Sequence, residues 1–220
     1  MDQIFKKLAL VGDVWVLWIL LVASVLSLGV IFERWWSFHK NKIAFASFLE
    51  ELGKRLDRND AVGARQLARN TAGVEAKVAL AGLTNLFKGS ASVEEAMTSR
   101  LVLERSQLEK NLVVLGTLGN NAPFIGLFGT VLGIIKAFND LAMSGASGVS
   151  VVMSGISSAL IATAFGILVA IPAVMANNYF QTRLRRISSN SQSLIHLFQV
   201  YLRDESHQRL KATVEPEPVA

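Results

Sequence analysis

Three long stretches of this chain carry no charged residue, and they constrain its fold more than any other feature. They cover residues 14–32, 112–135 and 141–182. A helix needs about 20 mostly apolar residues to cross the hydrocarbon core of a bilayer, and each stretch approaches or exceeds that length. Backbone N–H and C=O groups in lipid must find partners within the segment, which favours helices. The sequence therefore predicts an all-α membrane protein with three transmembrane helices.

The residues that flank these stretches set the expected boundaries. Glu33 and Arg34 end the first stretch beside Trp35 and Trp36, a pairing typical of a membrane interface. The first stretch is expected to be retained, because no small-residue cleavage site of the usual form follows it. We expect a short lead over 1–13, transmembrane helices over 14–38, 112–138 and 150–182, an insert over 39–111, a loop over 139–149 and a tail over 183–220 with a disordered end.

The insert reads as a set of amphipathic helices. Apolar residues from Phe45 to Leu56 recur at helical spacing, and a second helix is expected from Ala61 to Asn70. Ser92 followed by two glutamates resembles a helix N-cap. The helix that it begins is expected to continue without a break through Leu112 into the second transmembrane helix. The tail is expected to be helical as well.

The distribution of Lys and Arg predicts the orientation. The insert and the tail hold nearly all of these residues, whereas the loop over 139–149 holds none. Cationic residues concentrate on the cytoplasmic side of membrane proteins. We therefore expect a cytoplasmic insert and C-terminus, with the lead and the loop in the periplasm. The net charge of +5 then reflects topology, and no nucleic-acid partner is predicted.

Small residues gather on one side of the second and third helices in a helical projection. Such a face allows close approach of another helix. In the second helix the predicted packing or pore-lining residues are Pro123, Gly126, Gly129 and Gly133; in the third they are Ala159, Ala162 and Gly166. Pro172 is expected to kink the third helix, because proline cannot donate the helical hydrogen bond.

Two threonines lie within these small-residue faces. Thr130 in the second helix and Thr163 in the third are candidate ion-path residues, together with Ser157 and Ser158 near the outer end of the third helix. The alternative is that each threonine hydroxyl bonds to a backbone carbonyl one turn earlier and only assists packing. None of the three apolar cores holds a titratable residue. A proton path normally needs one, so a partner would have to supply a carboxylate.

Other functional classes find little support. The chain has no cysteine, and its three histidines lie far apart in sequence, so we predict no metal site and no cofactor. The charged residues of the insert match a solvated helical surface, and no nucleophile, acid pair or phosphate loop stands out. We therefore predict that the protein is not an enzyme.

Two sequence motifs resemble a known family. The run Ala122-Pro-Phe-Ile-Gly-Leu-Phe-Gly-Thr-Val-Leu-Gly133, the run Ala159-Leu-Ile-Ala-Thr-Ala164 and the following Val169-Ala-Ile-Pro-Ala173 are similar to the ExbB/TolQ/MotA proton-channel family, and to its ExbB/TolQ branch above all. The resemblance covers the three-span layout, the insert and both motifs. Thr130 and Thr163 fall on the two threonines of the family.

The resemblance implies an assembly and a function. Such proteins form a pentameric ring in the bacterial inner membrane around a dimer of a single-span partner of the ExbD/TolR type. The membrane aspartate of the partner lies near the two threonines. Ion flow moves the partner, and that motion energises TonB-type import, Tol-type envelope maintenance or gliding motility. A TonB/TolA-type or motility protein would be a further partner.

One position departs from the family pattern. Members of this branch usually carry glutamate five residues before the second threonine, and here that residue is Ser158. Hydroxyl oxygens suit Na⁺ as well as a proton relay, so H⁺ and Na⁺ remain alternative transported ions. A non-conducting membrane scaffold is the alternative function, and a membrane-anchored enzyme is a third reading with almost no support.

Overall fold

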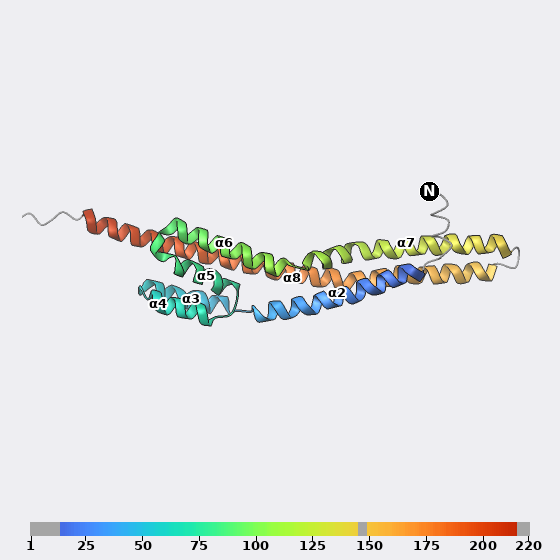
Figure 1. Cartoon of the computed structure of the whole chain (residues 1–220), viewed down its shortest axis with the longest axis horizontal. Coiled ribbons are helices and arrows are strands. Elements are labelled where there is room, and N and C mark those ends of the chain that lie inside the picture. Colours follow the sequence, from blue (N-terminus) through green and yellow to red (C-terminus); the bar gives the residue numbers. More distant parts are fainter. Residues whose placement is uncertain (1–13, 145–148, 215–220) are drawn as a thin grey trace, which may run out of the picture. The chain divides into compact units, whose positions relative to one another are not determined.

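The computed structural model describes residues 14–144 and 149–214, and within these ranges every regular element is a helix (Figure 1). The described chain divides into two compact units. The first comprises residues 14–35 and 111–181 without 145–148, and the second comprises residues 36–110 and 182–214. The predicted lead over 1–13 and the last six residues of the tail lie outside the described residues.

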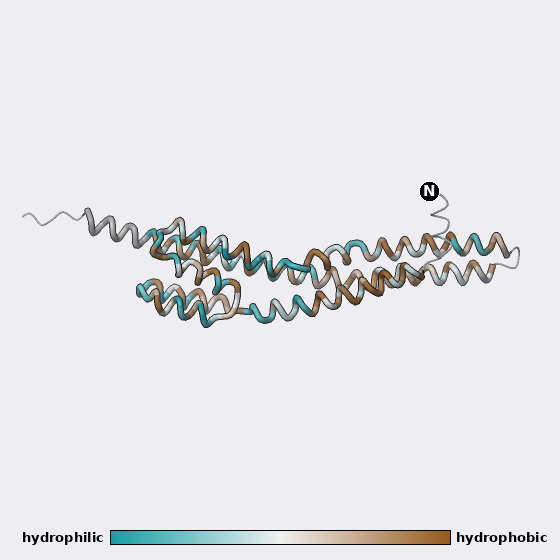
Figure 2. The backbone as a smooth tube through the Cα atoms, viewed as in Figure 1, coloured by the Kyte–Doolittle hydropathy of each residue, from teal (hydrophilic) through white to brown (hydrophobic). Residues whose placement is uncertain are grey.

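Three helices in the described ranges are long and apolar enough to cross a membrane. They are α2 (Val14–Lys40), α7 (Leu112–Ser144) and α8 (Val149–Val214). Figure 2 shows hydrophobic residues along most of α2 and hydrophilic residues toward its C-terminal end. The prediction of an all-α chain with three candidate membrane-spanning helices is confirmed for the part of the chain that the structure describes.

Helix α2 uses one side to contact α7 and α8. Val16, Leu20 and Ala23 of α2 are at most 5% exposed and pack with Ala122, Leu132, Val169 and Ala170. The Trp15 ring meets the Phe128 ring edge-on, with centroids 6.1 Å apart. Many large apolar side chains of α2 stay exposed, Trp18 and Val25 at 64% each. That composition suits a surface in contact with lipid.

Two of these helices extend beyond their predicted limits. Helix α7 continues from the predicted end at residue 138 to Ser144, so Asp140 lies on the helix and not in the predicted loop. Helix α8 continues from the predicted end at residue 182 to Val214 and runs through Pro172 as one helix. The tail is therefore helical as far as the structure describes it.

The second unit is a bundle of short helices joined to the C-terminal part of α8. It contains α3 (Phe45–Asp57), α4 (Ala61–Asn70), α5 (Val74–Thr84), the 3₁₀ turn η1 (Leu86–Lys88) and α6 (Ser90–Glu109). Helix α3 buries Phe48, Leu52 and Leu56, which recur every fourth residue. The Asp60 carboxylate caps α4 by accepting a hydrogen bond of 2.8 Å from the Gly63 N–H.

Two predictions about the insert are wrong. Helix α6 begins at Ser90 after Gly89, whose φ of +89° suits only glycine, so Ser92 lies inside the first turn and is not the N-cap. The helix also does not continue into the second transmembrane helix. It stops at Glu109, and Asn111 adopts a left-handed conformation with φ +65° before α7 begins.

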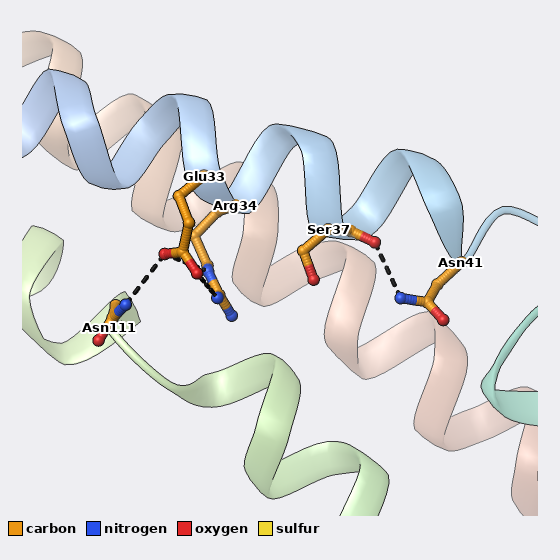
Figure 3. Close-up of polar contacts among 5 residues, drawn as sticks. All are labelled: Glu33, Arg34, Ser37, Asn41 and Asn111. Carbon is orange, nitrogen blue, oxygen red and sulfur yellow. Dashed lines mark hydrogen bonds and ion pairs between the residues drawn. The ribbon is translucent and has the colours of Figure 1, made fainter.

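A polar contact holds the chain at this break. The Asn111 side-chain amide donates a hydrogen bond of 2.9 Å to the Glu33 carboxylate, which also pairs with the Arg34 guanidinium (Figure 3). Arg34, predicted to lie at the membrane interface, is only 4% exposed, while Trp35 remains 59% exposed and stacks on Tyr179. Asparagine is the non-glycine residue that best tolerates the left-handed region and also supplies the amide.

Two substitutions of Asn111 are expected to separate the contribution of its left-handed backbone from that of its side-chain amide. Asn111→Gly keeps the backbone conformation and loses the amide, whereas Asn111→Ala loses the amide and strains the backbone. We expect the alanine variant to be less stable than the glycine variant by about 1 kcal/mol, as measured by thermal unfolding in detergent. Asn121→Ala is the control, because the Asn121 amide bonds to Thr117 O within its own helix α7. Equal stability of the two Asn111 variants would contradict the backbone argument.

Candidate functional site

Helices α7 and α8 touch backbone to backbone at two glycines. A methyl group added at Gly126 would lie 2.6 Å from the Ala162 carbonyl oxygen, and one added at Gly166 would lie 2.6 Å from the Ala122 carbonyl oxygen. Real side chains do not approach that closely. The small-residue faces of the two helices therefore meet each other within one chain, the arrangement that such faces favour in membranes.

The same contact extends along both helices. A methyl group at Gly119 would lie 2.6 Å from Val174 Cγ2, and one at Gly155 would lie 2.6 Å from Ala137 Cβ. Ala159 and Ala162 are fully buried, and Gly129 lies against Ala162 and against Val16 of α2. These positions pack between helices within one chain. A pore-lining role for them stays a prediction.

The two candidate threonines differ in their hydroxyl partners. Thr130 is 7% exposed, and its Oγ1 donates a hydrogen bond of 2.6 Å to Leu127 O within α7. That bond to the preceding turn is the packing alternative that the sequence left open. Thr130 thus resembles a structural residue in this conformation, although its hydroxyl oxygen keeps the capacity to accept a hydrogen bond.

Thr163 has no such partner. Its Oγ1 is buried and makes no hydrogen bond within the described parts of the chain. The Thr163 Cα would lie 3.0 Å from a methyl group at Gly126, one helical turn before Thr130 on α7. The α7–α8 contact therefore brings both threonines to neighbouring levels. An unpaired buried hydroxyl is unfavourable, so the site suits a water, an ion or a polar group from another molecule.

A pocket of about 390 Å³ lies between α7 and α8 toward their connection. Lys136 and Asp140 of α7 line it together with Ser154 and Ser158 of α8. The space is large enough for several water molecules. Of the predicted ion-path residues, Ser158 lines this pocket, while Ser157 is exposed and lies outside its lining. The α7 glycine Gly133 lines it as well.

Sequence reasoning did not include Lys136 and Asp140 among the site residues. It treated Lys136 as the residue that follows the uncharged stretch 112–135 and Asp140 as part of the loop over 139–149. Gly133, Lys136 and Asp140 follow one another at intervals of three and four residues. This spacing places all three on one face of a helix that continues to Ser144. That spacing is the sequence signal from which their shared face could have been predicted.

The remaining predicted residues are the two prolines, and both lie inside helices. Pro123 is half-buried in α7, and Pro172 is exposed in α8. Each removes one backbone donor from its helix. No cluster of three His, Cys, Asp or Glu side chains able to hold a metal ion occurs within the described ranges.

Comparison with known proteins adds a family model and individual relatives. The model of the MotA/TolQ/ExbB proton channel family matches residues 70–193, which contain α7, both threonines and the pocket. The chain is 39% identical to the Tol-Pal system protein TolQ of Pseudomonas aeruginosa over 115 residues, 52% of this chain and 50% of that protein.

Two further relatives are similar over comparable lengths. The biopolymer transport protein ExbB of Xanthomonas campestris is 34% identical over 123 residues, 56% of this chain and 46% of that protein. TolQ of Haemophilus influenzae is 42% identical over 109 residues, 49% of this chain and 47% of that protein. The chain thus matches about half the length of these curated relatives.

Proposed function

Because the chain belongs to the MotA/TolQ/ExbB proton channel family, we propose that it is the channel-forming subunit of an ion-driven motor in the bacterial inner membrane. The subunit uses the proton motive force to move a single-span partner of the ExbD/TolR type. Its relatives are named a Tol-Pal system protein and a biopolymer transport protein. The process that we propose is Tol-type envelope maintenance or TonB-type import, and gliding motility is a further candidate.

The unpaired Thr163 hydroxyl is the observation that carries this proposal. It is buried in a transmembrane helix beside the glycine contact, and none of the residues in the described ranges accepts or donates to it. No carboxylate occurs over residues 112–135 or 149–182. A membrane aspartate of the partner would complete the site, because the hydroxyl can donate to a carboxylate or accept from a carboxylic acid.

The assembly that we propose is a homo-oligomer, a pentamer by analogy with the family, in which α7 and α8 surround the partner. Helix α2 contributes the outer surface, in keeping with its exposed large apolar side chains. Cationic residues of the insert and tail support a cytoplasmic location for both and a periplasmic N-terminus.

The pocket beside Ser158 supports protons over Na⁺ as the driving ion. Lys136 and Asp140 line the same pocket as Ser154 and Ser158, so the formal charge of the lining is zero. A sodium ion held by the serine hydroxyls would gain no net attraction from a lining in which the two charges offset each other, whereas a proton can pass along water and hydroxyl groups.

We expect proton flux in sodium-free proteoliposomes that contain the protein with its co-purified partner. A pH-sensitive dye in the lumen reports the flux, and energised activity in cells should collapse with a protonophore. The variant Lys136→Ser leaves Asp140 as the one charged residue of this lining and should allow Na⁺ to compete. A requirement for Na⁺ combined with tolerance of the protonophore would overturn the proton assignment. Unchanged activity in Ser158→Ala would show that the pocket lined by Ser158 is not on the ion path.

A non-conducting scaffold is the alternative function. Two observations favour it: the Thr130 hydroxyl is already bonded to Leu127 O, and the position of the family glutamate is Ser158. The proteoliposome measurement separates the two functions, because a scaffold would give no flux above that of empty vesicles.

A further inference from the structure

A second pocket, of about 190 Å³, lies in the second unit. It is bounded by the C-terminal end of α2 and the residues after it, by the first turn of α5 and by α8 just past its uncharged stretch. The polar side chains that line it are Asn41, Lys42, Glu75, Arg183, Arg186 and Asn190, and apolar side chains complete the wall. Figure 3 shows that the Asn41 amide closes the end of α2 by donating to Ser37 O.

Glu75 is the unusual member of this pocket. Its side chain is only 1% exposed, and the Asn190 amide donates a hydrogen bond of 2.9 Å to Oε1. Oε2 is buried and accepts no hydrogen bond within the described residues. Burial of a carboxylate is strongly unfavourable unless both oxygens are paired. The pocket therefore presents an acceptor that needs a hydrogen-bond donor from outside the described residues.

The same pocket presents three cations. The side-chain nitrogens of Lys42, Arg183 and Arg186 make no ion pair or hydrogen bond within the described ranges. Together with Glu75 they give the lining a formal charge of +2. A ligand that fits this lining carries a negative charge for the cations and a hydrogen-bond donor for Glu75.

The position of these residues along their helices indicates where such a ligand resides. In α8 the uncharged stretch ends at Thr182, and Arg183 and Arg186 occupy the next turn. A turn advances by about 5 Å, comparable to the thickness of the lipid headgroup layer. On α2, Trp36 follows the uncharged stretch and carries the Lys40 ammonium 5.3 Å above its ring, a pairing typical of the membrane interface.

We propose that this pocket binds the headgroup of an anionic phospholipid. The phosphodiester contacts Arg183, Arg186 and Lys42, and a headgroup hydroxyl donates to Glu75 Oε2. Basic pockets at the cytoplasmic ends of transmembrane helices commonly hold such headgroups. Phosphatidylglycerol has both the charge and the hydroxyls. This inference goes beyond the proposed ion channel and does not depend on ion flux.

Native mass spectrometry of the delipidated full-length protein in mild detergent tests the proposal. Phosphatidylglycerol is compared with phosphatidylmethanol, which has the same charge and no headgroup hydroxyl, and with zwitterionic phosphatidylethanolamine. We expect binding in the order phosphatidylglycerol, phosphatidylmethanol, phosphatidylethanolamine, with about a tenfold difference between the first and the last. This comparison uses the unaltered protein, so it does not depend on the folding of any variant.

Variants locate the site. The double variant Arg183→Gln and Arg186→Gln should weaken phosphatidylglycerol binding at least about tenfold. Arg185→Gln is the matched control, because Arg185 is exposed on the same turn, bonds to Thr182 Oγ1 and does not line the pocket. Glu75→Gln should abolish the preference for phosphatidylglycerol over phosphatidylmethanol while leaving binding of both.

Three results would overturn the proposal. Equal binding of all three lipids would exclude recognition of charge and hydroxyl. An equal loss in Arg185→Gln and in the double variant would place binding outside the pocket. Complete displacement of the lipid by inorganic phosphate at the same concentration would show that the site takes a soluble anion.

Discussion

Gly126→Val is expected to disrupt the packing of α7 against α8 and to prevent assembly of the protein. The first carbon of the new side chain would lie 2.6 Å from the Ala162 carbonyl oxygen and 3.0 Å from Thr163 Cα. Both neighbours are backbone atoms, so no side-chain rotation relieves the overlap. Overpacked cores lose about 1–3 kcal/mol when side chains adjust, and we expect a loss at the upper end of that range or beyond.

The measurement is thermal unfolding in detergent together with size-exclusion chromatography. A loss of about 3 kcal/mol corresponds to a decrease in unfolding temperature of roughly 10 °C for a chain of this size. Gly29→Val is the matched control: Gly29 lies in α2, another transmembrane helix, and a methyl group there meets no atom within 4 Å. Equal effects of the two substitutions would show that the effect arises from helix propensity and not from the contact.

Thr163→Val is expected to lower ion flux strongly while leaving the oligomer intact. Valine has nearly the shape of threonine, so the packing around the residue is kept. The hydroxyl that it removes makes no hydrogen bond within the described residues, so stability should change by less than about 1 kcal/mol. If the hydroxyl binds the partner's carboxylate or the moving ion, its loss should lower flux about 10- to 100-fold.

Three further variants control this experiment. Thr163→Ser restores a hydroxyl and should recover most of the flux. Thr163→Ala should also remove function with the oligomer retained. Thr130→Ala should abolish energised function too if its oxygen takes part in the path, although it additionally loses the bond to Leu127 O. A loss of assembly in the Thr163 variants, with no specific loss of flux, would support the packing interpretation instead.

The general architecture could be predicted from the amino-acid sequence. Uncharged runs of bilayer length have few alternatives to a transmembrane helix, because a backbone in lipid must satisfy its own hydrogen bonds. The small-residue faces of the second and third helices followed from helical periodicity in the same way. Gly126 and Gly166, assigned to close packing on that basis, meet in the structure.

The break at Asn111 and the buried helix α5 could not be derived in this way. Asparagine is compatible with a helix interior, and only the contact with Glu33 shows why it takes a left-handed conformation here. Helix α5 is buried on nearly all sides, so its sequence lacks the alternation of apolar and polar residues that marks an amphipathic helix.

The sequence by itself determined which faces of the helices are small, which residues carry hydroxyl groups and where the charges end. Tertiary structure alone decided which polar groups have a hydrogen-bond partner and which line a pocket. It left Thr163 Oγ1 and Glu75 Oε2 unpaired within the described residues, and it placed Lys136 in the pocket of Ser158. The physical reason is that periodicity assigns a residue to a face, whereas a hydrogen bond depends on the neighbouring element that the face meets and on the rotamer that this contact permits.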